Sequence, residues 1–158
     1  LSMADVVEDG SFSLLPAYQR IITLVNGGGF HLAGSEGTDA DITFGKVHRF
    51  SGSEKIYCTL LAGRCLDFNL IFRPDRVDSR LDLCLLETEG AHFDTVVNPG
   101  SKLAIVALRG RANVHFEGSS LELGPLDSVL VEAIYRPRRL FASALTHPSC
   151  LALISISG

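Results

Sequence analysis

The chain has 158 residues, with 14 lysines and arginines against 18 acidic residues and a formal net charge of -4. This balance argues against a general binder of nucleic acids or of acidic membrane surfaces. Apolar residues make up 46% and charged residues 20%, which predicts a folded core rather than disorder. No apolar run approaches the roughly 20 residues that span a bilayer, and the first residues lack a signal-peptide pattern. We therefore expect a cytoplasmic protein with no nucleic-acid or membrane partner.

Short runs with β-strand character recur along the chain, separated by turn sequences. The runs cover residues 20–25, 56–61, 66–72, 103–108, 112–116, 128–133, 140–145 and 150–157. Glycine, proline and asparagine occupy the intervening segments. Residues 27–29, three consecutive glycines, are expected to form a hairpin turn, and residues 81–88 have the most helix-like pattern. The rhythm of strands and turns predicts an all-β sandwich or barrel.

The run of residues 66–73 alternates between two faces of an extended strand. The face expected to form the core carries Leu66, Phe68, Leu70 and Phe72, and the opposite face carries Asp67, Asn69, Ile71 and Arg73. Arg20 begins another apolar run. Its guanidinium must reach water, a carboxylate or a ligand, because unpaired burial of a charge is costly. A solvated outer face and a strand-end arginine that reaches solvent are the alternatives to a ligand site.

Two segments resemble copies of one β unit. One leads from residues 22–27 to residues 47–52, and the other leads from residues 104–110 through 114–116 and 121–123 to 124–131. The second has the order strand, glycine turn, short hairpin, G-x-x-D turn and strand. This order resembles the conserved part of a cupin barrel.

The sequence patterns of common catalytic and metal sites are missing. The five histidines are isolated, with no H-x-H pair, so we expect no metal and no other cofactor. A serine nucleophile would need a G-x-S-x-G turn, which is also missing. The four cysteines show no C-x-x-C spacing and are expected to be reduced thiols. The basic cluster at residues 135–139 is expected to be a solvated loop.

Several motifs, in order, closely resemble the HutD/Ves family. They lie at residues 2–6, 9–20, 22–30, 50–52 and 58–70. Beyond Arg73 the resemblance rests on the cupin-like rhythm. It implies an all-β fold of double cupin (RmlC-like jelly-roll) barrels within one compact unit of residues 1–158. The expected halves are residues 1–72 and 73–158.

The resemblance also carries a functional expectation. The family is associated with histidine utilisation, and its members are treated as regulatory or accessory proteins that respond to a small carboxylate such as formylglutamate or a urocanate-derived acid. Arg20 falls at the family's D-R position, with Gln19 in place of the acidic residue, and Asp67 and Asn69 fall at its D-F-N position. The family pattern includes an upstream segment with a tryptophan, and this sequence has no tryptophan.

Combining the alternation with the resemblance, we predict a ligand pocket for a small carboxylate. The candidate ligand-binding residues are Arg20, Asp67, Asn69, Arg73, Phe50, Phe68 and His48. Arg20 would hold the carboxylate through charge-assisted hydrogen bonds, and Asn69 would bind a second polar group. Asp67 would orient either of them, with Phe50 or Phe68 as an apolar wall.

We expect a binding protein without catalytic residues, and two other classes stay open. The first is a metal-free cupin isomerase or lyase in which His48 acts as general acid and base beside Arg20. The second is a structural or partner-binding module, with an exposed apolar sheet face used for dimerisation. A histidine bonded to Arg20 in a closed pocket would indicate the enzyme, and a filled barrel interior would indicate the module. Open sheet edges are compatible with a homodimer.

Overall fold

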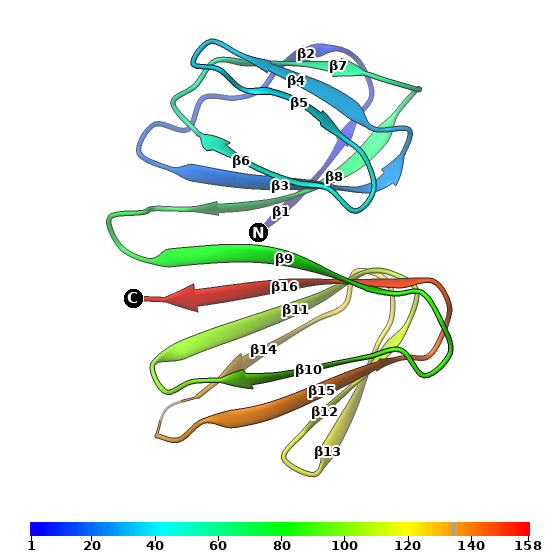
Figure 1. Cartoon of the computed structure of the whole chain (residues 1–158). Coiled ribbons are helices and arrows are strands. Elements are labelled where there is room, and N and C mark those ends of the chain that lie inside the picture. Colours follow the sequence, from blue (N-terminus) through cyan, green and yellow to red (C-terminus); the bar gives the residue numbers. More distant parts are fainter. Residues whose placement is uncertain (134) are drawn as a thin grey trace. The chain divides into compact units, whose positions relative to one another are not determined.

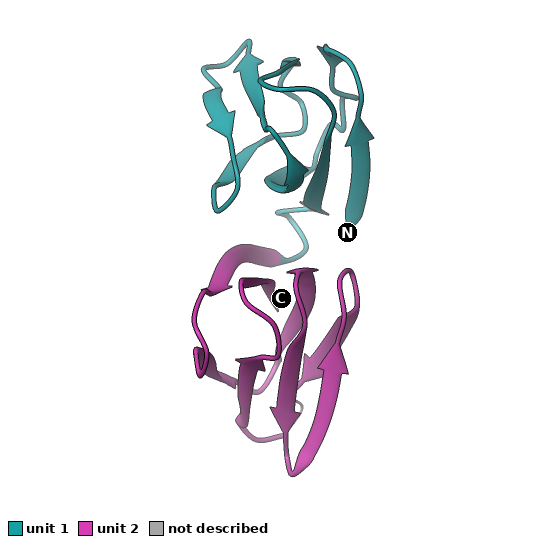
Figure 2. Ribbon diagram, turned by 90° about the vertical axis from the view of Figure 1, so that its right-hand side faces the viewer, with its two compact units in different colours: residues 1–77 teal, residues 78–158 magenta. Residues whose placement is uncertain are grey.

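The computed structural model describes residues 1–133 and 135–158, and these residues form antiparallel strands joined by turns (Figure 1). The all-β prediction is confirmed. The chain divides into two compact units, residues 1–77 and 78–158 (Figure 2). The boundary follows Val77 rather than Phe72, because the turn after the last strand of the first unit is closed by a hydrogen bond from the Val77 N–H to the Arg73 carbonyl. No helix long and apolar enough to cross a membrane occurs in the described ranges.

The first unit contains two four-stranded antiparallel sheets. One has the order β1 (Ser2–Val6), β8 (Cys65–Phe72), β3 (Gln19–Gly27) and β6 (Val47–Ser51). The other has the order β2 (Gly10–Ser11), β7 (Ile56–Leu60), β4 (Phe30–Gly34) and β5 (Asp39–Ile42). Buried side chains of both sheets form one core, to which Ile22 and Leu24 come from β3 and Phe30 and Leu32 from β4. The two sheets therefore enclose a common interior.

The second unit repeats this strand order. One sheet has the order β14 (Ser128–Glu132), β11 (Ser101–Arg109), β16 (Ser149–Ser157) and β9 (Asp78–Leu86). The other has the order β10 (His92–Val97), β15 (Arg138–Ala144), β12 (Ala112–Phe116) and β13 (Ser119–Leu123). Read from its other edge, the first of these sheets matches β1, β8, β3 and β6 strand for strand, as the internal repeat in the sequence predicts. The buried cluster inside this unit consists of apolar side chains.

Two local predictions were wrong, and both errors have tertiary causes. Residues 81–88 are not helical, because β9 pairs with β16 over its whole length, from Asp78 opposite Ser157 to Leu86 opposite Ser149. Residues 27–29 are not a hairpin, since they carry the chain from β3 in one sheet to β4 in the other. Gly27 has a φ of 101°, and a Cβ there would lie 2.6 Å from the Arg64 carbonyl oxygen, so the close approach of the two segments requires glycine.

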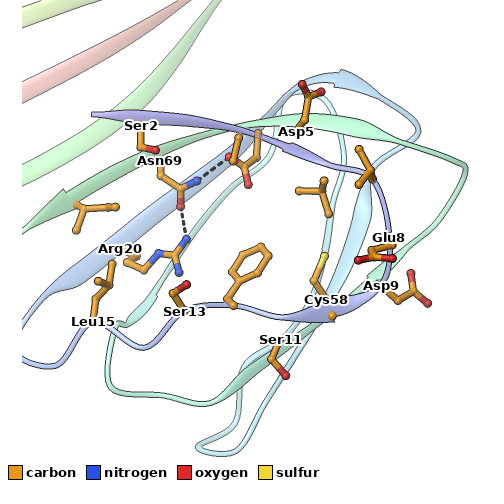
Figure 3. Close-up of a pocket in the computed structure, with 17 residues that line it drawn as sticks. Ser2, Asp5, Glu8, Asp9, Ser11, Ser13, Leu15, Arg20, Cys58 and Asn69 are labelled. Atoms are coloured by element: carbon orange, nitrogen blue, oxygen red, sulfur yellow. Dashed lines mark hydrogen bonds between the residues drawn. The ribbon is translucent and has the colours of Figure 1, made fainter.

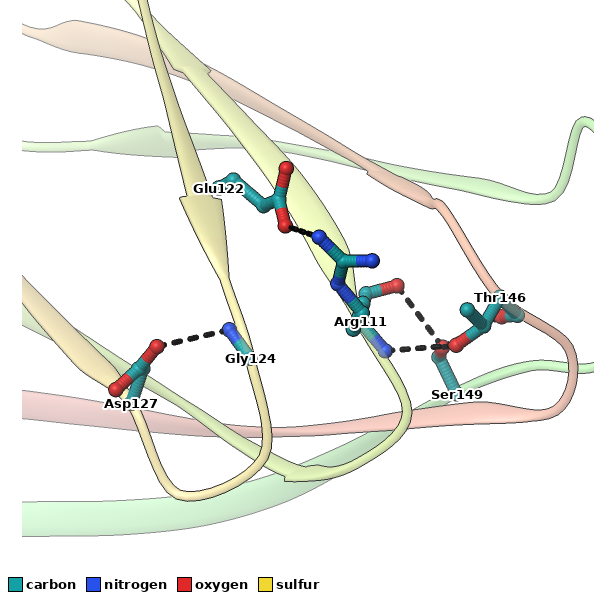
Figure 4. A network of polar contacts seen from close by, with 6 residues as sticks. All are labelled: Arg111, Glu122, Gly124, Asp127, Thr146 and Ser149. Carbon is teal, nitrogen blue, oxygen red and sulfur yellow. Dashed lines mark hydrogen bonds and ion pairs between the residues drawn. The ribbon is translucent and has the colours of Figure 1, made fainter.

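Polar contacts stabilise the turns of the second unit (Figure 4). In the predicted G-x-x-D turn, the Gly124 N–H donates to Asp127 Oδ2 at 2.9 Å. The connection between β15 and β16 is tied to β12 by the Arg111 N–H, which donates to Thr146 Oγ1 at 2.8 Å. Ser149 Oγ donates to the Thr146 carbonyl at 2.6 Å. These bonds satisfy backbone groups that the strand ladders leave unpaired.

Candidate functional site

The pairing of β3 with β8 turns the polar face of β8 into the first barrel. Asn69 lies opposite Ile22, and Asp67 lies opposite Leu24. Side chains of directly opposed residues share one face, and Ile22 and Leu24 belong to the interior cluster. Asp67 and Asn69 are accordingly only 2% and 3% exposed, and Arg20, on the same face of β3, is 8% exposed. The solvated outer face considered from the sequence is excluded.

Phe68 is buried, as expected for a core face, but it does not belong to the interior cluster that contains Ile22 and Leu24. Phe68 and Leu70 point to the opposite face of β8 and are buried there. Because both faces of β8 are buried, an apolar pattern on one face could not identify the interior side of the sheet. Phe68 is therefore not a wall of the pocket.

Arg20, Asn69 and Asp67 form a continuous hydrogen-bonded line across the two strands (Figure 3). Arg20 Nη2 donates to Asn69 Oδ1 at 2.8 Å. The amide of Asn69 in turn donates through Nδ2 to Asp67 Oδ1 at 2.7 Å. Asp67 also accepts a hydrogen bond from the backbone N–H of Ala4 in β1. Asn69 thus joins the guanidinium to the carboxylate, and the three side chains hold one another in place.

Two aromatic rings contact the guanidinium of Arg20. Its central carbon lies 4.9 Å from the ring centroid of Phe12 and 5.0 Å from that of Phe50, which is cation–π geometry. Phe50 therefore contacts Arg20 as predicted. The Nε of Arg20 is buried and has no hydrogen-bond partner among the described residues. A buried N–H donor without an acceptor is costly, so the burial of this guanidinium lowers the stability of the fold.

Burial shifts the ionisation of both charged groups. It lowers the pKa of Arg20, and the charge of Asp67 partly opposes this shift. Burial raises the pKa of Asp67 from 3.8 to about 6, against the opposing effects of the Ala4 N–H, the Arg20 charge and the Asn69 hydrogen bond. Asp67 is thus ionised for the most part at neutral pH and balances the charge of Arg20.

The polar line faces a cavity of about 490 Å³. Residues 2–15, which include β1 and β2, form one wall, and the remaining lining residues are Arg20, Cys58, Asp67, Asn69 and Ile71. A volume of this size is typical of pockets for small molecules. Burial raises the pKa of the Cys58 thiol to about 12, so this group is a neutral wall of the cavity and not a nucleophile at neutral pH.

Two other predicted site residues lie away from this cavity. Arg73 follows β8 in a turn, where its side chain is 41% exposed and pairs with Asp75 at 2.7 Å. Its position one step beyond the strand takes it out of the barrel. His48 stacks on Phe50, with ring centroids 6.2 Å apart, and is not a lining residue. Its buried Nε2 has no hydrogen-bond partner among the described residues, so no bond links it to Arg20 through that atom.

The sequence reading missed Phe12 and the whole N-terminal wall. Phe12 comes from a short turn-rich segment without strand periodicity, so alternation could not assign it to a face. It reaches the interior because the Phe12 N–H donates to the Ile56 carbonyl at 2.9 Å, directly after the two-residue pairing of β2 with β7. The only signal in the sequence was an isolated aromatic residue between two serines, Ser11 and Ser13.

The second unit provides an internal comparison for the polar line. Both long strands carry a register shift, which follows Leu24 in β3 and Ala107 in β11. Arg20 lies four residues before the shift in β3, and Leu103 lies four residues before the shift in β11, so Leu103 corresponds to Arg20. The partners of β11 on β16 place Leu151 and Leu153 at the positions of Asp67 and Asn69. The same fold thus accepts three leucines at these positions, and the polar line is not a requirement of the barrel.

Groups of histidine, cysteine and acidic side chains that could hold a metal ion are missing from the part of the chain that the structure describes. All four cysteines are free thiols. The described cavity wall contains no histidine. The described lining offers the donor groups of Arg20 and Asn69 and the carboxylates of Asp5, Glu8, Asp9 and Asp67.

Comparison with known proteins adds the family context. The HutD family model matches residues 1–144. An uncharacterised 21.2 kDa protein in the hutC 3′ region of Pseudomonas putida is 41% identical over 81 residues, which cover 51% of this chain and 43% of that relative. Protein Ves of Citrobacter koseri is 31% identical over 81 residues, 51% of this chain and 42% of that protein. The matched region thus spans less than half the length of these relatives.

Solved structures show the same fold. A conserved protein of unknown function from Pseudomonas aeruginosa PAO1 matches with a TM-score of 0.85 and 28% identity, over 99% of this chain and 80% of that chain. HutD from Pseudomonas fluorescens SBW25, in a structure titled as a formate condition, matches with a TM-score of 0.76 and 24% identity, over 98% of this chain and 76% of that one. A cupin 2 conserved barrel domain protein from Leptotrichia buccalis matches at 0.50 and 12% identity, over 96% and 80%. The expected resemblance and the double cupin fold are confirmed.

Proposed function

Because the chain belongs to the HutD family, we propose that it is a regulatory or accessory protein linked to histidine utilisation that binds a small carboxylate in its first barrel. The link to histidine utilisation is supported by the name of the Pseudomonas putida relative, which refers to the hutC region. The observation that carries the binding proposal is the buried guanidinium of Arg20, which lines a cavity of about 490 Å³ together with Asn69.

The site is preorganised to receive an anion. Phe12 and Phe50 both contact the guanidinium, and Asn69 accepts a hydrogen bond from one of its terminal nitrogens. A carboxylate oxygen that reaches the Arg20 guanidinium would form a charge-assisted hydrogen bond inside a largely buried site, where such bonds are strongest. Little side-chain entropy would be lost on binding, because Arg20 is already fixed.

The same geometry argues against the histidine-based catalysis considered as an alternative. A general acid or base must come within hydrogen-bond reach of the reacting group. The described lining offers no histidine, and His48 stacks on Phe50. The lining carboxylate with a raised pKa, Asp67, is held by hydrogen bonds from Asn69 and from the Ala4 N–H. The second barrel, with Leu103, Leu151 and Leu153 in the corresponding positions, supports one ligand site per chain.

Isothermal titration calorimetry with formate, urocanate and N-formylglutamate tests the proposal. Arg20→Ala should weaken binding of the recognised acid by about 30-fold or more, as expected for the loss of a charge-assisted bond of about 2 kcal/mol or more. Arg73→Ala is the matched control, because it removes an arginine that lies outside the cavity and pairs with Asp75. Equal affinities of wild type and Arg20→Ala, or no binding of any small carboxylate by the wild type, would refute the proposal.

A further inference from the structure

The charges that line the cavity are unevenly distributed. Arg20 is the only cationic side chain among the described lining residues, which also include the acids Asp5, Glu8, Asp9 and Asp67. Figure 3 shows Arg20 and Asn69 at one end of the cavity and Glu8 and Asp9 at the other. The cavity therefore has a cationic end and an anionic end.

The acids differ in how far they are already neutralised. Asp67 belongs to the polar line with Arg20, and Asp5 pairs with Arg64 at 2.9 Å. Asp9 accepts the backbone N–H of Leu60 at 2.8 Å, which fixes its carboxylate without cancelling its charge. Glu8 has no ion-pair partner within the described residues. Two negative charges therefore remain at the end of the cavity away from Arg20.

Two independent observations thus point to the two ends of one ligand. Arg20 is more than nine-tenths buried, and its guanidinium lines the cavity as the one cation among the described lining residues, so it favours an anionic group there. Glu8 and Asp9 favour a cation at the far end and repel a second anion there. Both acids are exposed, so salt reduces this second effect without removing it.

We propose that the site selects a zwitterionic acid, whose carboxylate binds Arg20 and whose ammonium or other protonated nitrogen faces Glu8 and Asp9. This inference rests on the proposed carboxylate binding and adds the charge of the opposite end of the ligand. A molecule with two carboxylates fits the cationic end equally well but is repelled at the anionic end. The far-end charge is therefore the basis of discrimination among small acids of similar length.

Three probes with matched chains test this inference in calorimetry at low salt. 5-Aminopentanoate, pentanoate and glutarate present an ammonium, a methyl group and a second carboxylate, respectively, at the end away from the bound carboxylate. We expect affinity to fall in that order, with a ratio of about tenfold or more between 5-aminopentanoate and glutarate. The double variant Glu8→Gln/Asp9→Asn should reduce this ratio to near one, because it removes both charges and keeps the side-chain shapes.

A second double variant provides the matched control. Glu87→Gln/Glu89→Gln removes two exposed charges from the second unit and should leave the ratio unchanged. If glutarate binds as tightly as 5-aminopentanoate, or if Glu8→Gln/Asp9→Asn leaves the ratio unchanged, the zwitterion inference fails while carboxylate binding stands. If none of the three acids binds and Arg20→Ala has no effect on any other small acid, both proposals fail. The affinity ratio is measured within each variant, so a change in overall stability does not affect it.

Discussion

Replacing Asp67 with asparagine should stabilise the folded protein at neutral pH. The carboxyl group of Asp67 is 2% exposed, and its pKa rises from 3.8 to about 6 because burial disfavours the ionised form. Asparagine has nearly the same shape and resembles the protonated acid. The variant therefore removes the cost of ionising a buried group.

The magnitude follows from the raised pKa. A tenfold change in a proton equilibrium corresponds to about 1.4 kcal/mol, so ionising Asp67 costs the folded state about 3 kcal/mol relative to the unfolded chain. Asparagine offers one acceptor oxygen instead of two, and the loss of one of the hydrogen bonds from Ala4 and Asn69 costs about 1 kcal/mol. We expect a net gain of about 2 kcal/mol in the free energy of unfolding at pH 7.5.

The raised pKa of Asp67 also predicts how the stability difference between the two proteins changes with pH. Between pH 4 and pH 6, approximately, the folded wild type binds a proton at Asp67 that the unfolded chain has released. The contribution of this group to stability is therefore fully present below about pH 4 and is lost as the pH rises through about 6. In Asp67→Asn this contribution no longer depends on pH, so the two proteins should differ most above pH 7 and least near pH 4.

Urea denaturation of both proteins between pH 4 and pH 8 measures this difference. Asp78→Asn, which changes an exposed carboxylate at the start of β9, is the control for the loss of one negative charge. An Asp67→Asn variant that is less stable than wild type at pH 7.5 would show that Asp67 stabilises the fold in its ionised form. A difference that does not shrink toward pH 4 would show that it does not come from the ionisation of Asp67. Either result would contradict the prediction that the ionised carboxyl group of Asp67 costs the folded state about 3 kcal/mol.

Two further predictions concern the same polar line. The triple variant Arg20→Leu/Asp67→Leu/Asn69→Leu copies the residues of the second barrel and should fold with a stability equal to or up to a few kcal/mol above that of wild type, because apolar packing replaces a buried ionic network. It should bind no carboxylate in calorimetry, and a triple variant that fails to fold would show that the barrel needs the polar line. Carboxylate affinity of the wild type should rise from pH 8 to pH 5.5, since protonation of Asp67 leaves the charge of Arg20 uncompensated; a flat profile for a ligand that stays ionised over this range would contradict the proposed role of Arg20.

Local sequence patterns predicted the strands well because strands and turns leave local signals. Residues 112–116 were predicted as a strand with the same limits as β12, and the other predicted strands differ from the observed ones by a few residues at their ends. The prediction for residues 81–88 was wrong. Their pattern is ambiguous by itself, and pairing with β16 decided the strand.

The candidate site was predicted only in part, because its residues are far apart along the chain. Arg20 and Asn69 are 49 residues apart, and only the antiparallel pairing of β3 with β8 brings them within hydrogen-bond distance. Alternation placed Arg73 on the same face as Asp67 and Asn69, but β8 ends at Phe72 and the turn carries Arg73 out to Asp75. Phe12 had no periodic neighbours and entered the site only through the hydrogen bond of its segment to β7.

By itself the sequence determined the all-β class, the internal repeat, the family and the alternation that puts Asp67 and Asn69 on one side of a strand. Tertiary structure decided which side of that strand faces the barrel interior. Both sides of the strand are buried, and a hydrophobic pattern shows only whether a side is buried, not what buries it. It also decided that Arg20 is held between Phe12 and Phe50 with one donor unpaired. Such an arrangement depends on contacts among three segments that no local pattern connects.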